Sequence, residues 1–230
     1  MLLFLSILIS YIPEQEHKEN GNDDIKEIFV GFKENFTNIK LRISLLFTIV
    51  VNIAMLGFNA TIIFYLQDQL KLSNSLVGIV YSIAGFGSLI AVTFLSTFLN
   101  KKDAFILMNI SMATIPLVIM ASGIVENWIF FGICYSILSG LITIASVSIT
   151  TIQQQESTEY NIGKILSSSF VIATIFAPFG GILAAYFNWL LNPRLSLVIL
   201  GLLSSLLVIL IKSYEKKLTK KRTAIIIKED

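Results

Sequence analysis

The chain contains six apolar runs that are each long enough to cross a membrane as a helix. An α-helix rises about 1.5 Å per residue, so a hydrocarbon core of about 30 Å needs roughly 17–25 apolar residues. None of the six runs contains Asp, Glu, Lys, Arg or His. The pattern predicts an all-α membrane protein whose spans cover residues 43–66, 76–99, 104–122, 128–151, 165–187 and 195–211.

A shorter apolar run of eleven residues, from Leu2 to Ile12, precedes these spans. As a helix it would reach about 16 Å, roughly half of the hydrocarbon core. We expect residues 1–12 to be the residual end of a preceding transmembrane helix. An interfacial or re-entrant start and a signal sequence are the alternatives.

The charged segment 13–42 is expected to be a cytosolic linker that contains an amphipathic helix. Its apolar residues recur at helical spacing, and Lys and Glu occupy the other positions around the helix. These apolar residues are Ile25, Ile28, Phe29, Phe32, Phe36 and Ile39. Such a helix would lie on the surface of the bilayer or of the protein.

Positive charge is distributed unequally between the two sides of the predicted bundle. Of 17 Lys and Arg residues, 15 lie in the linker, in alternate connections or in the tail 212–230, and only Lys71 and Arg194 lie on the opposite side. Because Lys and Arg are enriched on the cytoplasmic side, we expect both termini to be cytosolic. Lysine outnumbers arginine, as in proteins from AT-rich bacteria, so the bacterial plasma membrane is the expected location.

Composition excludes several functional classes. Hydrophobic residues make up 55% of the chain and charged residues 14%, against about 25% charged residues in soluble domains. The net charge of +2 gives no indication of nucleic-acid binding. The one histidine, His17, lies in the linker and the one cysteine, Cys134, lies in a span, so no metal-ligand cluster is expected. We therefore expect no enzymatic activity, metal or cofactor, and the lipid bilayer as a partner.

Uncharged polar residues form a stripe on two of the spans. They are spaced by three, four or seven residues, so each set shares one helical face. The sets are Thr48, Asn52 and Asn59 in the first span, and Tyr135, Ser139, Thr143 and Ser146, continued by Thr150, in the fourth. Facing lipid would leave such groups without hydrogen bonds. We expect them to line an aqueous or substrate cavity, with interhelical hydrogen bonding as the alternative.

Proline and glycine interrupt two of the other spans. Pro116 lies in the middle of the third span, and Pro178 is followed by Gly180 and Gly181 in the fifth. Proline removes a backbone hydrogen bond and clashes with the preceding turn, so these residues are expected to kink their helices.

The order and spacing of these features resemble the C-terminal half of a major facilitator superfamily transporter, in the drug- or macrolide-efflux branch. The opening run followed by IPE is similar to the end of the family's sixth helix and the start of its central loop. The segment DIKEIFVGFKENFTNIKLRISLL resembles the amphipathic stretch before the seventh helix. NATIIFYLQDQLKLSNSLVGIVYSIAGFGSLIA resembles the seventh and eighth helices, and TTIQQQESTEYNIGKILSSSF the connection from the tenth to the eleventh.

This resemblance implies inner-loop and gating roles for two pairs of residues. Lys101 and Lys102 lie in the short loop LNKKD, which lacks the Gly-and-Asp pattern that this loop often shows. Gly163 and Lys164 lie where relatives often carry a Gly-Arg pair.

The resemblance further implies a six-helix half-bundle that acts with an N-terminal six-helix half, whether that half is missing or a separate chain. In this fold the seventh and tenth helices line the central cavity, and they correspond to the two spans that carry the polar stripes. A neutral lining suits a small amphipathic organic substrate, exported by alternating access. The alternatives are a truncated or split-gene product that is inactive alone, and a membrane scaffold or assembly subunit that transports nothing.

Overall fold

The computed structural model describes residues 30–98 and 104–229, with side chains described for residues 30–97 and 104–220. The described helices are α3 (Ile39–Phe64), the π-helical segment η1 (Tyr65–Gln69), α4 (Asn74–Phe98), α5 (Ala104–Ile124), α6 (Trp128–Glu156), α7 (Ile162–Leu190) and α8 (Pro193–Glu229). Residues 30–37 form a further helical segment, the linker helix, which a bend at Asn38 separates from α3. The described residues include no β-strand.

The six predicted membrane helices are confirmed. Six helices of 21–31 residues are long and apolar enough to cross a bilayer. Five of them contain a whole predicted run, and α4 covers the run 76–99 as far as Phe98, the last described residue before the gap. The helices extend past the apolar runs, most of all α8, which continues through the basic tail. The N-terminal segment 1–12, linker residues 13–29, and Lys101 and Lys102 lie outside the described residues.

Asparagine begins three of the helices by the same interaction. The Asn38 side chain accepts a hydrogen bond from the Lys40 N–H at 2.9 Å, and Asn127 and Asn192 do the same for Ile129 and Leu195 at 2.8 Å. Each bond satisfies an N–H group that has no partner within its own helix. In α8 the first residue is Pro193, which has no N–H to satisfy.

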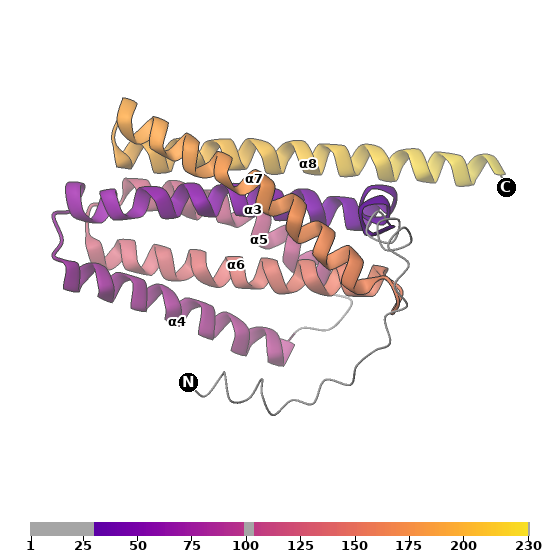
Figure 1. The fold of residues 1–230 in the computed structure, drawn as a ribbon, viewed down its shortest axis with the longest axis horizontal. Coiled ribbons are helices and arrows are strands. Elements are labelled where there is room, and N and C mark those ends of the chain that lie inside the picture. Colours follow the sequence, from indigo (N-terminus) through magenta and orange to yellow (C-terminus); the bar gives the residue numbers. More distant parts are fainter. Residues whose placement is uncertain (1–29, 99–103, 230) are drawn as a thin grey trace, which may run out of the picture.

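Successive helices run in opposite directions, so alternate helices begin at the same end of the bundle (Figure 1). We call the end where α3, α5 and α7 begin the Lys40 end, and the end where α4, α6 and α8 begin the Arg194 end. The helix α3 contacts α7, α8 and α6, whereas α6 packs mainly against α4 and α5. In Figure 1, α7 crosses α3 obliquely. The helix α6 lies between α3 and α4.

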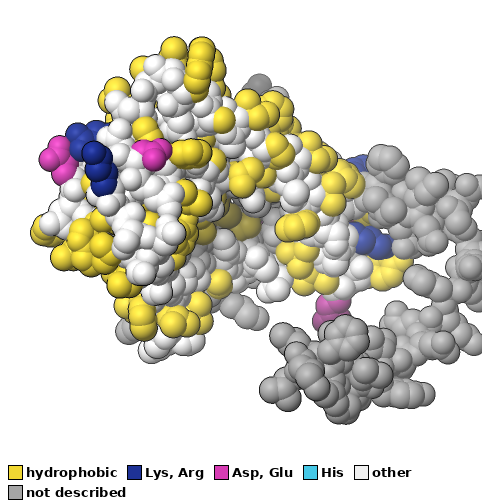
Figure 2. Space-filling model, turned by 60° about the vertical axis from the view of Figure 1, so that its left-hand side comes forward, with side chains coloured by type: hydrophobic (Ala, Val, Ile, Leu, Met, Phe, Trp, Pro, Cys, Tyr) yellow, Lys and Arg dark blue, Asp and Glu magenta, His cyan; other side chains and the backbone are white. Residues whose placement is uncertain are grey.

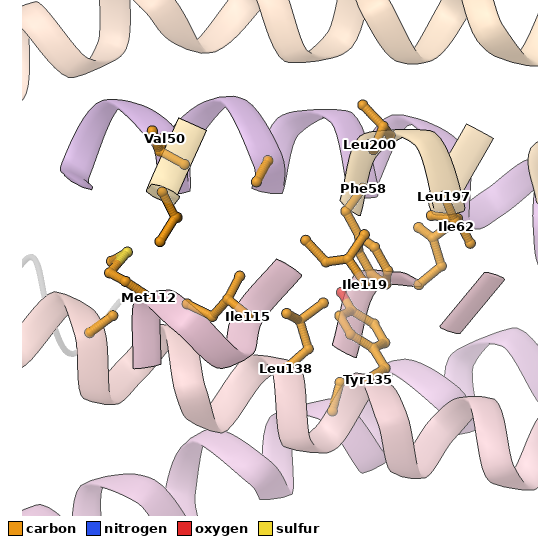
Figure 3. Packing of buried hydrophobic residues seen from close by; sticks show 14 of the residues in the cluster. Val50, Phe58, Ile62, Met112, Ile115, Ile119, Tyr135, Leu138, Leu197 and Leu200 are labelled. Carbon is orange, nitrogen blue, oxygen red and sulfur yellow. The ribbon is translucent and has the colours of Figure 1, made fainter. Parts of the chain in front are cut away.

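The core lies where α3, α5, α6 and α8 face each other (Figure 3). Most of its members are aliphatic, with a few large aromatic side chains. They include Val50, Phe58, Ile62, Met112, Ile115, Ile119, Leu138, Leu197 and Leu200. Because lipid is as apolar as these side chains, the packing stabilises the bundle by close van der Waals contact more than by exclusion of water.

The surface between the two ends carries almost no charge. In Figure 2 the charged side chains lie at the ends of the described bundle, and hydrophobic or uncharged side chains cover the region between them. Large hydrophobic residues are exposed along every long helix, among them Phe86, Ile110, Phe130, Ile182 and Leu206. Such a surface is stable in contact with lipid, so the protein is a multi-pass membrane protein.

Glycine allows the backbones of neighbouring helices to touch. A Cβ atom added to Gly180 would overlap the carbonyl oxygen of Ile53 on α3. At the neighbouring Gly181, an added Cβ would lie 3.8 Å from a Leu56 methyl group, which is ordinary contact. The structure therefore gives Gly180 a packing role at the crossing of α3 and α7. Pro116 and Pro178 lie inside α5 and α7, both of which continue past the proline.

We predict that Gly180→Ala lowers the thermal unfolding midpoint by about 3–10 °C, because relieving the overlap with the α3 backbone costs about 1–3 kcal/mol. Gly181→Ala is the matched control, and it should leave the midpoint unchanged or slightly raised, since alanine favours the helix. Thermal unfolding of the purified protein in lipid nanodiscs measures both. Equal midpoints for the two variants would contradict the assigned backbone contact.

Candidate functional site

A cavity of about 440 Å³ lies between α3, α6 and α7, in the half of the bundle nearer the Lys40 end. Its lining combines apolar side chains with uncharged polar ones. The lining residues are Thr48, Val51, Asn52 and Met55 of α3, Ile142, Ser146, Ile149, Thr150 and Gln153 of α6, and Leu166, Ser169 and Phe170 of α7. None of these residues is charged, so the cavity suits a neutral, partly apolar molecule.

Four of the eight stripe residues from the sequence border this cavity: Thr48, Asn52, Ser146 and Thr150. The Thr48 hydroxyl donates to the Ser44 carbonyl at 2.8 Å, and the Asn52 amide donates to the Thr48 carbonyl at 2.9 Å. Both bonds stay within α3, so neither group is used to hold another helix. The remaining acceptor sites of these two side chains are available to an occupant of the cavity.

The structure places the other four candidates elsewhere. Tyr135 is 7% exposed and packs in the core beside Phe58, with ring centroids 5.2 Å apart (Figure 3). The Ser139 hydroxyl lies 2.7 Å from that of Ser88 on α4. Thr143 donates to the Ser139 carbonyl at 2.9 Å, and Asn59 is exposed. None of these four residues borders the cavity.

Whether a candidate borders the cavity depends on its position along the helix axis more than on the helical face that it occupies. Tyr135 and Ser139 share a face with Ser146, but they lie in the half of α6 that meets α4 and the aromatic residues of α3. Asn59 lies seven residues beyond Asn52, on the same face but toward the Arg194 end. Spacing along one helix indicates a shared face and says nothing about which neighbour covers each part of that face.

Gln153, Ser169 and Phe170 line the cavity and were not among the candidates. Gln153 continues the α6 stripe three residues after Thr150, so helical spacing could have found it. No pattern pointed to Ser169 and Phe170. They lie in the run SSSF, in which three successive serines point to different sides of α7. Only the packing of α7 against its neighbours decides which of these residues faces the cavity.

The linker helix is fixed to α7 by Asn35, which is fully buried. Its amide nitrogen donates to the Ile165 carbonyl at 3.0 Å and to the Ser168 hydroxyl at 2.8 Å. Its amide oxygen accepts from the Ser169 hydroxyl at 3.0 Å. Since Ser169 also lines the cavity, this cluster connects the linker helix directly to the cavity wall.

Further contacts join the linker region to the connection between α6 and α7. Asn161 donates to Glu34 at 2.7 Å, and Lys40 pairs with Glu156 at 2.5 Å. An added Cβ at Gly31 would overlap the carbonyl of Lys164, so the linker helix touches the first turn of α7. The ammonium of Lys164 lies 4.1 Å from the centre of the Tyr160 ring. The second gating candidate of this pair, Gly163, has open space around it.

Aromatic side chains pack between α3 and α6 in the opposite half of the bundle, and an exposed ion pair lies at its end. Phe131 stacks on Tyr65 with centroids 5.0 Å apart, and the Tyr65 hydroxyl donates to the Val125 carbonyl. Arg194 pairs with Glu126 at 3.0 Å across the two connections at this end. The stacking of Phe131 on Tyr65 joins α6 to the end of α3 near the Arg194 end, whereas the cavity lies between α3, α6 and α7 nearer the Lys40 end.

Two other hollows lie at the ends of the described bundle. One of about 400 Å³ at the Arg194 end includes Asp68 and Trp189. Another of about 1000 Å³ at the Lys40 end includes Lys40, Glu156 and Glu215. Both contain charged residues at the boundary of the spans. Of these three hollows, the cavity between α3, α6 and α7 lies within the apolar length of the helices.

The described residues contain no group of His, Cys, Asp and Glu that could hold a metal ion. The cavity lining offers hydroxyl and amide groups, and none of these residue types carries charge at neutral pH. Such a lining can bind and release a neutral compound.

The chain matches the family model described as Major Facilitator Superfamily over residues 1–167. No curated protein and no solved structure matches the chain. Six helices that are long and apolar enough to span a bilayer define a multi-pass helical membrane protein. Because the match covers most of its length, the chain belongs to the major facilitator superfamily, whose members are transporters.

We predict that Asn35→Ala speeds trypsin cleavage after Lys33 at least about fivefold, because losing the buried hydrogen bonds favours release of the linker helix. Thr37→Ala is the matched control, since the exposed Thr37 hydroxyl bonds only to Lys33 and Glu34 of its own helix. Limited proteolysis in nanodiscs, followed by mass spectrometry, measures the rate. Cleavage at the wild-type rate in Asn35→Ala would show that Asn35 does not hold the linker helix.

Proposed function

We propose that this protein is one half of a secondary active transporter that exports small amphipathic organic compounds. The cavity between α3, α6 and α7 would form part of the substrate path. The observation that carries this proposal is the cavity itself, which combines an uncharged polar wall with apolar side chains inside a bundle of the major facilitator superfamily. A charged metabolite would find no counter-charge there.

The distribution of charge supports entry of the substrate from the cytosol. The Lys40 end carries the linker helix, the α7 start and the basic part of α8, whereas Lys71 and Arg194 are the described basic residues at the Arg194 end. The enrichment of Lys and Arg on cytoplasmic sides assigns the Lys40 end and both termini to the cytosol. The cavity lies nearer this end, and in the other half Phe131 stacks on Tyr65 where the cavity does not extend. A compound from the cytosol or the inner leaflet could therefore enter, as export requires.

A second six-helix half would complete the substrate path. Major facilitator transporters enclose the substrate between two six-helix halves, and the described bundle supplies one of them. The helices α4 and α7 bury the smallest shares of their residues within the bundle. Asn59 of α3, which is exposed in this bundle, would also face the second half in place of lipid.

We predict that Asn52→Leu lowers the export rate of the neutral dye Nile red about fivefold, because leucine removes a polar group from the cavity wall. Asn109→Leu is the matched control. Asn109 of α5 is also half-buried, and its amide bonds to the carbonyl four residues earlier at 2.8 Å, but it does not line the cavity. Efflux is measured in bacteria that lack their own exporters and express the chain together with an N-terminal six-helix half. Equal export by the two variants would remove the cavity from the substrate path, and a complete absence of export would favour the scaffold role.

The orientation has a separate test in a Cys134→Ser background. We expect a membrane-impermeant maleimide added to intact cells to label Lys71→Cys and to leave Lys216→Cys unlabelled until the cells are opened. The reason is that the side with fewer basic residues faces outward. The reverse labelling pattern would invert the assigned orientation and, with it, the direction of substrate entry.

A further inference from the structure

Arg42, near the start of α3, carries a positive charge that no described acidic side chain neutralises. Its guanidinium group lies over the Tyr214 ring of α8, 5.5 Å from the ring centre, and forms no ion pair with a described Asp or Glu. Arg194, the other arginine whose side chain is described, pairs with Glu126. A half-buried cation without an anion is costly, because it has lost part of its water and gained no charged partner.

The two terminal nitrogens of the Arg42 guanidinium group are open to a ligand. The third nitrogen, Nε, is buried and has no partner. The terminal nitrogens also have no hydrogen bond to a described residue, but they are not buried, so they reach the molecular surface. Two such nitrogens can donate side by side to two oxygens of one phosphate group. The Tyr214 ring beside them is 38% exposed.

Arg42 lies at the level of the lipid headgroups. It immediately precedes the first apolar run, and Lys212 immediately follows the last one, so α3 and α8 both reach the membrane boundary here. Tyrosine is enriched at this level in membrane proteins, because its ring is apolar and its hydroxyl is polar. Lipid phosphates occupy the same layer. A phosphate can therefore meet the Arg42 nitrogens without entering the hydrocarbon core.

The acidic side chains of the 1000 Å³ hollow at the Lys40 end belong to a different surface. Glu156 and Glu215 border that hollow, whereas Arg42 and Tyr214 do not. Because Glu215 directly follows Tyr214, the two side chains lie about 100° apart around α8. Lys217 is exposed and follows Tyr214 by three residues, on the same side of α8. The surface beside Tyr214 is therefore basic and open to an anion.

We propose that Arg42, Tyr214 and Lys217 form a binding site for the phosphate of an anionic phospholipid, in the leaflet at the Lys40 end. The terminal nitrogens of Arg42 donate to the phosphate oxygens, and Lys217 adds positive charge beside them. A zwitterionic lipid is bound less well, because its own cation opposes this charge. A lipid is favoured over free phosphate, since the bilayer concentrates its phosphate at this level. The site is separate from the cavity and does not depend on the proposed substrate.

Two lipids with the same acyl chains test this site, phosphatidylglycerol with one net negative charge and phosphatidylcholine with none. Native mass spectrometry of the full chain in detergent measures the dissociation constant of the first bound lipid. We expect phosphatidylglycerol to bind about fivefold more tightly, a modest ratio because the site is partly exposed to water. Arg42→Gln should reduce this ratio to about one. Arg42→Lys keeps the charge but loses the paired donors, so a ratio of about two is expected.

Lys216→Gln is the matched control, because it removes one positive charge from the same turn of α8. Lys216 follows Tyr214 by two residues, so it points to the opposite side of the helix, where it interacts with Glu215. This variant should keep the fivefold ratio. In phosphatidylcholine nanodiscs, Arg42→Gln should lower the thermal unfolding midpoint by at most about 3 °C, since the fold loses only its contact with the Tyr214 ring.

Three outcomes would overturn the proposal. The first is the wild-type ratio in both Arg42 variants, which would exclude Arg42 from lipid binding. The second is an equal loss of preference in Arg42→Gln and Lys216→Gln, which would show a diffuse attraction to the whole basic end. The third is displacement of bound phosphatidylglycerol by inorganic phosphate, which would assign the site to a free anion. Each result leaves the Nile red export test unaffected.

Discussion

The position of the cavity depends on the backbone contact between α3 and α7. Gly180 lets α7 lie directly against the carbonyl of Ile53, so α7 is held beside α3 and makes few contacts with α6. The space that remains between α6 and α7, with α3 as its floor, is the cavity. In a bilayer, small residues are the means of such close approach, because apolar side chains gain little by exchanging lipid for protein.

Most polar side chains of the spans are hydrogen-bonded within their own helix. Most Ser and Thr hydroxyls within the spans return to a carbonyl three or four residues earlier in the same helix, as Thr48 and Thr150 do. Few polar groups connect separate segments, and the Asn35 cluster on α7 is the most extensively bonded of these. Against this background the Arg42 guanidinium group stands out, because no described side chain supplies it with an anion.

Helical spacing predicted the spans and part of the cavity wall. Charge-free apolar runs located all six helices, and the stripe rule selected Thr48, Asn52 and Ser146, which border the cavity. The same rule selected Tyr135, which packs beside Phe58 in the core. It missed Ser169, because polar residues occur all around the start of α7. The role of Thr48, Asn52 and Ser146 as a substrate site stays a prediction.

The sequence by itself determined the class of protein, because transferring charged or unpaired polar groups into lipid is so costly that apolar length defines each span. It also determined where α3, α6 and α8 begin, since their Asn caps act locally. Only the tertiary structure decided which half of each polar stripe borders the cavity. That choice depends on where helices cross, and the crossing at Gly180 joins residues more than a hundred positions apart.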